Sequence, residues 1–582
     1  MISLENGRDV RETMKGLNKQ FAASLILVMV VAVAAAVFSI TSSLSSTHSA
    51  KNSQGMGQTH AISDAGTGNG TGAQMPARKQ GKISTNSKSA THNPPNVKSQ
   101  NAPQNGKSSK NGRPSGNAVG GQTVKNGANH SNGPPHSVSS GSGGSMLGQQ
   151  TGTQSSLSNN LITVYSILYL IVIITCFVLN RKRKIRVHKQ TIKALMGSLL
   201  VVALCTRLAL APWISGHMDL MLFQNWAQSA ASRLTNFYQS SHADYPPLYI
   251  YVLYGIGKAV TLPGLSGGYT LLLKLPSILA DVLTAWLIYH IAGKKGHEWL
   301  GLAAGAFYLF NPAIWMDSVI WGQVDSFFTL IIVLALNCLI KRRYFLSTAL
   351  FAASVMMKPQ GIIFLPLLAY VFIRDRKIGK GFLALGWYAL ITALIALPFS
   401  FHASGGALWL VQLMKRTISE YPYASVNAFN FFSLIGGNFQ SDSAELFIFS
   451  YHTWGMLAIV LISLVSLWMV LRKHSIRMVM IAGLIQIAGV FTFATGMHER
   501  YLYPAMALAL ICWLITEDHR FAVLAIGYSF TNFMNLYFIY FLSGTMAASY
   551  SVPLVVTSLV NVLLFGYLVW TAFTVRQKSG LS

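Results

Sequence analysis

The chain has 582 residues, of which 52% are apolar and only 10% are charged. Many apolar runs are long enough to cross a hydrocarbon core, which takes about twenty residues, so the composition is typical of a polytopic membrane protein and excludes an ordinary soluble domain. The formal net charge of +27 does not indicate a nucleic-acid partner, because the cations lie mainly in short loops between apolar runs and in one long polar segment.

All four cysteines, Cys176, Cys205, Cys338 and Cys512, lie inside apolar runs. Buried cysteines of this kind usually act as small apolar residues. The sequence therefore predicts neither a disulfide framework nor a thiolate metal site, and we expect no cofactor.

Residues 1–40 begin with a polar stretch that contains several Arg and Lys residues, and Phe21 to Ile40 then form a continuous apolar run. A signal anchor and a cleaved signal peptide both fit this pattern. The run is longer than the usual apolar core of a signal peptide, which favours the anchor.

Residues 41–160 consist of Ser, Gly, Asn, Gln, Lys and Pro with very few apolar side chains, and Asp64 is the one acid among them. Such a composition buries too little apolar surface to offset the entropy of ordering, so it predicts a disordered, basic, extracytoplasmic linker. Two roles remain open for it. It is either a solvated spacer or a segment that contacts anionic cell-wall polymer or membrane lipid by salt-dependent attraction.

The second apolar run ends at Leu179, and the basic cluster at 181–186 marks its cytoplasmic end by the positive-inside rule, within a segment 161–190. Residues 191–575 then predict one all-α membrane domain, a bundle of about twelve spans that follows the N-terminal span and the linker. The further spans are expected at 192–214, 271–292, 299–315, 324–340, the short pair 345–357 and 361–373, 381–399, 450–471, 477–495, 503–516, 520–541 and 553–573.

The segment Tyr245 to Leu262 is apolar but is broken by Pro246-Pro247 at its start and by Pro263-Gly264 at its end. We expect an interfacial helix there that does not cross the membrane. Counting spans from the basic cluster then places the loops richest in polar chemistry on one face. This favours a multi-pass membrane protein with an extracytoplasmic site.

Two carboxylates stand out in the first of these loops. Asp219 lies beside a membrane-spanning run, where a charge is costly unless it is paired, hydrated or used. The alternative is that Asp219 caps a surface helix beginning near Leu220. Asp244 precedes Tyr245-Pro246-Pro247, which is either a structural turn or a rigid backbone beside a site.

Polar residues gather again around 311–326, where Asp317, Gln323 and Asp325 accompany two tryptophans. Two acids could hold a hard cation, but the spacing matches no recognised metal signature. Packing between loops is an equally good explanation.

His498-Glu499-Arg500 places an imidazole, an acid and a guanidinium together at a membrane boundary. A guanidinium offers a bidentate fork that stays charged, which suits a phosphate group. The alternative is that His498 and Arg500 bind Glu499 or lipid headgroups rather than a substrate phosphate. Lys358 lies where a helix is interrupted on the same face. It is either a further cation of the site or a lysine whose side chain extends to the membrane interface.

These residues, in this order, resemble the GT-C superfamily of polyprenyl-phosphate-sugar-dependent glycosyltransferases. The resemblance is closest to bacterial relatives of the GPI-anchor second mannosyltransferase and more distant to the dolichyl-phosphate-glucose glucosyltransferases. It covers about 192–573 and leaves out the first 190 residues. The matching pieces are His217-Met218-Asp219, Asp244-Tyr245-Pro246-Pro247-Leu248, Trp321-Gly322-Gln323-Val324-Asp325-Ser326, Met357-Lys358-Pro359-Gln360, Tyr421-Pro422-Tyr423 with Asn427, and His498-Glu499-Arg500-Tyr501.

The resemblance implies a GT-C-like bundle with loop helices on its extracytoplasmic side. It implies that Asp219 is the catalytic base, that the donor is a hexose, at family level mannose, on a polyprenyl phosphate, and that the sugar is inverted without a metal. The acceptor is an unspecified glycan, lipid or protein. The donor phosphate would be held by His498, Arg500 and Lys358, and the other candidates for the substrate site are Asp244, Tyr245, Gln323, Asp325, Glu499, Tyr423 and Asn427.

Two functions other than glycosyl transfer stay open. A transporter or flippase of a lipid-linked sugar predicts ionisable residues near the membrane midplane and broken helices. Here the ionisable residues gather at one face, with Asp281 as an exception, which favours an enzyme. The other alternative function is that of an envelope scaffold that acts through its basic linker.

Overall fold

The computed structural model describes residues 26–27, 29–42, 158–175, 188–214, 218–241, 243–293, 296–472, 475–543 and 549–575. The chain divides into one unit made of 1–55 with 145–582 and a second made of 56–144, and every residue described here belongs to the first. The predictions for residues 1–20, for most of the linker 41–160 and for the basic cluster 181–186 lie outside the described residues.

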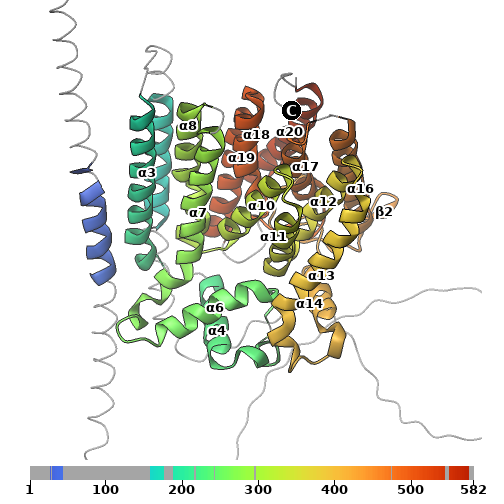
Figure 1. The fold of residues 1–582 in the computed structure, drawn as a ribbon, viewed down its shortest axis with the longest axis horizontal. Helices are drawn as coiled ribbons and strands as arrows, with labels where there is room; N and C mark the ends of the chain where they lie inside the picture. The colour runs from blue at the N-terminus through green and yellow to red at the C-terminus, as the bar shows by residue number, and fades with distance from the viewer. Residues whose placement is uncertain are drawn as a thin grey trace, which may run out of the picture. The chain divides into compact units, whose positions relative to one another are not determined.

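Helices make up nearly all of the described chain, with one small hairpin (Figure 1). The α-helices and strands are α3 Lys189–Leu210, α4 Met218–Ser232, α5 Phe237–Ser240, α6 Pro247–Val260, α7 Tyr269–Gly293, α8 Glu298–Leu309, α9 Pro312–Trp315, α10 Asp325–Ile340, α11 Tyr344–Met357, α12 Leu365–Arg374, α13 Ile378–Ser400, α14 Trp409–Ile418, α15 Phe431–Leu434, β1 Glu445–Leu446, β2 Phe449–Ser450, α16 Tyr451–Arg472, α17 Met478–Phe493, α18 Pro504–Thr516, α19 His519–Tyr537 and α20 Val552–Thr574. Two π-helices, Met316–Trp321 and Phe538–Ser543, follow α9 and α19.

The prediction of an all-α polytopic membrane protein is confirmed. Within the described residues, seven helices are long and apolar enough to cross a membrane, and an eighth span results if α8 and the bent segment Pro312–Trp321 are counted together. The other spans expected from the sequence are shorter apolar helices of 10–17 residues, at Met29–Ser42, Asp325–Ile340, Tyr344–Met357, Pro359–Arg374, Met478–Phe493 and Pro504–Thr516. The expected number of about twelve therefore includes helices that do not reach membrane length by themselves.

The segment expected at the interface forms α6, which begins at Pro247 and is not among the helices of membrane length. Proline suits this place, since the first turn of a helix needs no backbone donor. Figure 1 shows α4, α6 and α14 together at one end of the helix bundle.

A sharp break in the chain shapes this end of the bundle. Asn311 caps α9 by accepting a hydrogen bond from the backbone N–H of Ala313 at 2.9 Å. The π-helix then ends at Gly322, whose φ of +82° lies in the left-handed region that favours glycine. A Cβ atom at this position would lie 2.8 Å from Leu220 Cδ2. The turn therefore presses directly on the start of α4.

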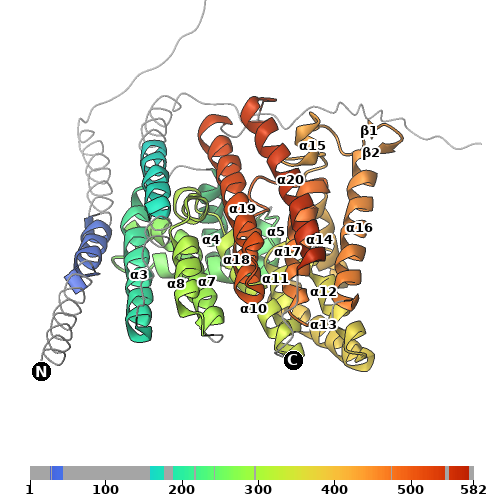
Figure 2. The ribbon, with the colours of Figure 1, turned by 90° about the horizontal axis from the view of Figure 1, so that it is seen from above.

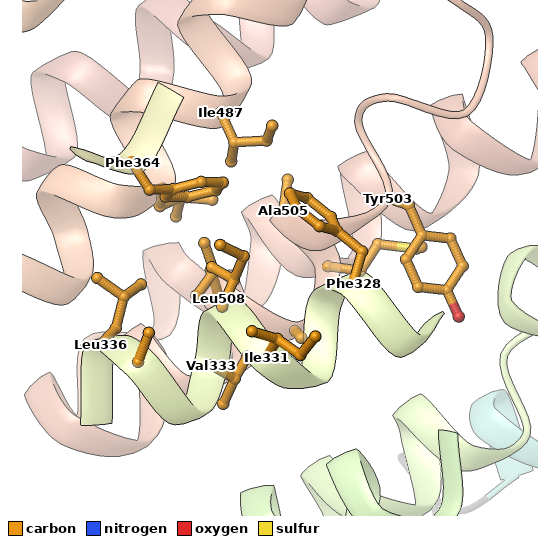
Figure 3. Packing of buried hydrophobic residues seen from close by; sticks show 14 of the residues in the cluster. Phe328, Ile331, Val333, Leu336, Phe364, Ile487, Tyr503, Ala505 and Leu508 are labelled. Carbon is orange, nitrogen blue, oxygen red and sulfur yellow. The ribbon is translucent and has the colours of Figure 1, made fainter. Parts of the chain in front are cut away.

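The apolar core is centred on α10, which packs against α17 and α18 (Figure 3). Phe328 and Ile331 of α10 are buried among side chains from these neighbours, including Leu508. The hydroxyl of Tyr503 points away from this cluster, and it donates to Asp281 at 2.9 Å. The first residues of α10 are thus fixed by a packed interior, and rigid elements of this kind hold functional groups well.

Two buried cations within spans join neighbouring segments. Arg207 of α3 donates to the carbonyl of Leu309 at 2.6 Å. Lys274 of α7 donates to the carbonyls of Ile214 at 2.5 Å and Val319 at 2.6 Å. Lys274 therefore ties the segment after α3 to the π-helix Met316–Trp321.

Three of the four cysteines, Cys205, Cys338 and Cys512, are free and buried in the structure. Cys176 lies outside the described residues.

Candidate functional site

Asp219 is the second residue of α4, so it stands at the positive end of that helix. Its Oδ2 atom accepts hydrogen bonds from the indole N–H of Trp321, at 2.8 Å, and from the side-chain amide of Gln323. Both donors flank the turn at Gly322. The capping alternative expected a helix that begins near Leu220, whereas α4 already includes Met218, so Asp219 lies inside the first turn and its Oδ2 accepts from two side chains outside the helix.

Asp325 lies between two cations. The ammonium of Lys358 is 2.8 Å from Oδ1 of Asp325, and both side chains are almost fully buried. Arg500 Nε is 3.7 Å from Oδ2 of the same carboxylate. Among the described residues, neither that Nε nor that Oδ2 has a hydrogen-bond partner. Arg500 and Asp325 therefore form an ion pair in which neither of these two atoms has a hydrogen bond to a described residue.

In the segment His498-Glu499-Arg500, the side chains of the outer two residues both approach the carboxylate of Glu499. Arg500 Nη1 donates to Glu499 Oε1 at 2.5 Å, while His498 Nδ1 is 3.9 Å from the other carboxylate oxygen of Glu499. Burial raises the pKa of Glu499. Burial, together with Arg500 and Lys358, holds the pKa of His498 well below its usual range. His498 is accordingly a neutral hydrogen-bonding group near pH 7 rather than a cation.

Asp244 and Tyr245 belong to the same neighbourhood. Burial raises the pKa of Asp244, while the charges of Arg500 and Lys358 act in the opposite direction. The Lys358 ammonium lies 6.0 Å from the centre of the Tyr245 ring. The turn before α6 therefore faces the cations of the site.

Aromatic rings join α4 to this turn. The ring of Tyr245 lies 5.6 Å from that of Phe223 and 5.4 Å from that of Trp226, both on the buried face of α4. Tyr249 of α6 lies 5.8 Å from Phe223. Aromatic contacts in this range stabilise packing beyond the area they bury. They hold the helix that carries Asp219 against the turn that carries Asp244.

Tyr423 and Asn427 shape the backbone around His498. Asn427 adopts a φ of +58° and forms backbone bridges with His498. Its carbonyl accepts from the side-chain amide of Asn535 at 2.8 Å. The carbonyl of Tyr423 accepts from the N–H of Gly496 at 2.9 Å. The contacts seen for both residues therefore position the 494–498 segment.

Trp321 links the two halves of the site. Its indole N–H bonds Asp219, and the guanidinium carbon of Arg500 lies 5.9 Å from the centre of its ring. The acid and the cation thus flank one tryptophan. Trp321 was part of a recognised motif, but sequence reasoning did not assign it to the site, because an indole in an apolar context usually indicates packing.

Two further buried charges were not assigned to the site. The carboxylate of Asp317 is fully buried, and neither of its oxygens has a hydrogen-bond partner among the described residues. Lys274, described above, was also missed. A charged residue inside an apolar run of membrane length is the signal that could have identified Lys274. Within the part of the chain that the structure describes, no group of three or more His, Cys, Asp or Glu side chains is placed to hold a metal ion.

An apolar groove lies beside the first two turns of α10. It has a volume of about 490 Å³ and is lined by side chains of α6, α7 and α10, including Val252, Ile256, Leu279, Phe327 and Leu330. Phe327 follows Asp325 by two residues, and α6 begins just after the Asp244 turn. The groove therefore adjoins the start of α10, which carries Asp325, and the middle and later turns of α6.

Residues 224–481 match a family described as GPI transamidase subunit PIG-U, a GT-C-like membrane family. The match spans less than half of the chain. It includes Asp244, Asp325 and Lys358, and it stops short of Asp219 on one side and of the 498–500 segment on the other. No curated protein matches the chain significantly.

Proposed function

We propose that this protein is an inverting glycosyltransferase that moves a hexose, by family resemblance mannose, from a polyprenyl-phosphate donor to an envelope acceptor. In this proposal it acts at the extracytoplasmic face of a bacterial plasma membrane. The observation that carries the proposal is the pairing of a half-buried carboxylate, Asp219, with a guanidinium, Arg500, on either side of Trp321.

Asp219 serves as the general base. The acceptor hydroxyl oxygen attacks the anomeric carbon of the donor, the bond from that carbon to the phosphate oxygen breaks, and the hydroxyl proton passes to Asp219. The bonds that Trp321 and Gln323 donate to Oδ2 fix the orientation of the Asp219 carboxylate. A positioned base of this type contributes typically about 10²–10⁴-fold to the rate.

The departing polyprenyl phosphate keeps the electron pair of the broken bond and gains negative charge. Cations placed where that charge develops stabilise the transition state more than the ground state. Arg500 offers its Nε–H, which has no hydrogen-bond partner among the described residues, and Lys358 lies across the same carboxylate. His498, being neutral, contributes a hydrogen bond rather than a charge.

The prenyl chain of the donor lies in the groove between α6, α7 and α10. Its lining is apolar and includes Phe327 of α10, two residues after Asp325. Each methylene buried there contributes roughly 0.8 kcal/mol to donor binding. Long-chain donors should therefore bind more tightly than short-chain analogues.

The decisive experiment replaces Asp219 with asparagine, which keeps the shape of the side chain and its hydrogen bond from Trp321 but removes the base. Transfer from a polyprenyl-phosphate sugar should fall by about 10²-fold or more, while donor binding changes little. Turnover within a few-fold of the unaltered protein, with the variant folded, would remove Asp219 from this role.

A second candidate is a non-catalytic subunit that binds a lipid-linked glycan. The similarity to a family of GPI transamidase subunits favours it, since the matching segment omits both Asp219 and the 498–500 segment. A flippase of a lipid-linked sugar is the third. Both rivals expect Asp219→Asn to leave the protein active in its own assay, namely glycan binding for the subunit and lipid translocation for the flippase, with no sugar transferred by either form.

A further inference from the structure

The small hairpin before α16 exposes two large apolar side chains at its tip. Strands β1 and β2 are antiparallel, with Leu446 opposite Phe449, and only Phe447 and Ile448 connect them. The exposed fractions of these two side chains are 89% and 76%. No other large hydrophobic side chain in the described chain is as exposed as either of them.

The turn is an unusual place for a phenylalanine. Phe447 adopts a φ of +62°, in the left-handed region. Two-residue hairpin turns that need a positive φ favour Gly, Asn or Asp there, because a bulky side chain is disfavoured in this region. Neither burial nor turn preference explains an aromatic residue at this position. Contact with an apolar environment outside the chain would explain it.

The base of the hairpin is fixed to α16 through Trp454. The indole N–H of Trp454 donates to the carbonyl of Leu446 at 2.9 Å, and its ring lies 5.3 Å from that of Phe449. Helical periodicity places Trp454 on one face of α16 with Leu457, Leu461, Leu464 and Trp468.

That face of α16 is exposed at the surface of the protein. Each of these four residues is exposed in a helix that is long and apolar enough to span a membrane. An exposed apolar face on such a helix is in contact with lipid. The hairpin is therefore fastened to the lipid-facing side of the span, and Figures 1 and 2 both show it at the rim of the bundle beside α16.

We propose that the tip formed by Phe447 and Ile448 inserts into the membrane interface beside α16, in the leaflet at the end of the bundle that carries the candidate site. The two side chains continue the apolar face of α16 beyond the first residue of the helix, Tyr451. The occupant is lipid rather than a protein because the hairpin lies over the same face that α16 presents to lipid. This contact is independent of the proposed transfer reaction.

The test uses nitroxide labels on the full-length protein in phosphatidylcholine vesicles. Ile448→Cys reports on the tip, and its high exposure leaves the fold unaffected. Leu461→Cys is the matched control for the lipid-facing side of α16, and Ser443→Cys, an exposed residue just before β1, is the control for water. Collision rates with molecular oxygen and with a water-soluble nickel chelate are measured at each position.

We expect the label at 448 to collide with oxygen in preference to nickel, as at 461, while the label at 443 shows the opposite preference. A nickel-dominated signal at 448 that equals the signal at 443 would overturn the proposal. So would a label that is in water in the vesicles but shielded from both reagents in native membranes, because a protein partner would then cover the tip.

Discussion

Asp325 is the residue through which the charges of the site are connected. Its carboxylate pairs with Lys358 at 2.8 Å and lies 3.7 Å from Arg500 Nε, and it is only 1% exposed. A buried charge that loses its partner is strongly destabilising, whereas removing both charges together often costs little. The arrangement predicts a strong coupling between Asp325 and Lys358.

Asp325→Asn should therefore lower the free energy of unfolding by about 3–5 kcal/mol, because Lys358 is left buried without its closest counter-charge. Combining it with Lys358→Met should restore much of the loss. Unfolding of the purified protein in mixed micelles measures all three variants. Lys189→Met is the control, because it breaks an ion pair with Glu298 in which the lysine is exposed, and it should have little effect. Simple additivity of the two site substitutions would contradict the coupling.

Glu420 makes the stability of the folded protein depend on pH. Its side chain is exposed at the surface, yet desolvation and the nearby Asp244 carboxylate raise its pKa from the ordinary value of 4.5 to about 7. Between these values the folded protein binds a proton that the unfolded chain releases. Stability contributed by this group is present below about pH 5 and is lost as the pH rises through about 7.

Glu420→Gln should make the thermal midpoint fall less steeply between about pH 5 and pH 8. The change should be modest, since solvent screens an exposed group. Glu445→Gln, on the exposed strand β1, serves as the control and should leave the slope as it is. Identical slopes for the Glu420 variant and the unaltered protein would show that Glu420 ionises normally.

Sequence reasoning identified most of the residues that come together, but not how they are paired. It separated Asp219, Gln323, Asp325, Lys358 and Arg500 from the rest of the chain, and the structure places them in two connected groups. It could not assign Trp321, because the hydrogen bond from its indole depends on a turn at Gly322 that returns the chain to α4. Contacts across more than a hundred residues leave no local pattern in one sequence.

At the scale of elements, the close approach of α4 and α6 aligns the two carboxylate-bearing segments. A Cβ atom on Gly257 of α6 would lie 2.2 Å from the carbonyl oxygen of Ala227 and 2.8 Å from Cβ of Ala231. Both partners belong to α4, and one of them is rigid backbone. Only glycine allows the two helices to lie this close.

Gly257→Ala should push α4 and α6 apart and cost about 1–3 kcal/mol. The displacement also moves Asp219 away from Trp321, so transfer should fall more than the amount of folded protein does. Gly255→Ala is the matched control in the same helix, since a Cβ there meets nothing within 4 Å. That change should be neutral or stabilise by about 0.4–1 kcal/mol. Equal effects of the two substitutions would show that α6 tolerates a shift at Gly257.

The positions of helices were predictable because apolar runs and prolines mark them. Pro247 and Pro504 each stand at the start of a helix where the sequence suggested one. The bent segment after α8 was not predictable in the same way. An apolar run from 299 to 315 reads as one span, whereas Asn311 caps a new helix and the chain continues into a π-helix. Hydropathy averages over such a break and conceals it.

At the scale of the whole molecule, the bundle and the polar linker are separable in sequence. All of the candidate site residues lie between 219 and 500, whereas the second unit is 56–144. That unit is rich in Ser, Gly, Asn, Gln, Lys and Pro, and it contains none of the residues assigned to the candidate site. An enzyme whose chemistry resides in the bundle should therefore work without it.

Deleting residues 56–144 should leave transfer from a polyprenyl-phosphate sugar within a few-fold of the full-length chain, because all of the candidate site residues lie outside the deleted segment. Any attachment to anionic cell-wall polymer should weaken in the deletion variant, and in the full-length chain it should weaken as salt rises. The two readouts separate the enzyme from the scaffold interpretation. If transfer vanished while the bundle stayed folded, the basic linker would be required for the reaction. The helix bundle would then not be sufficient for transfer.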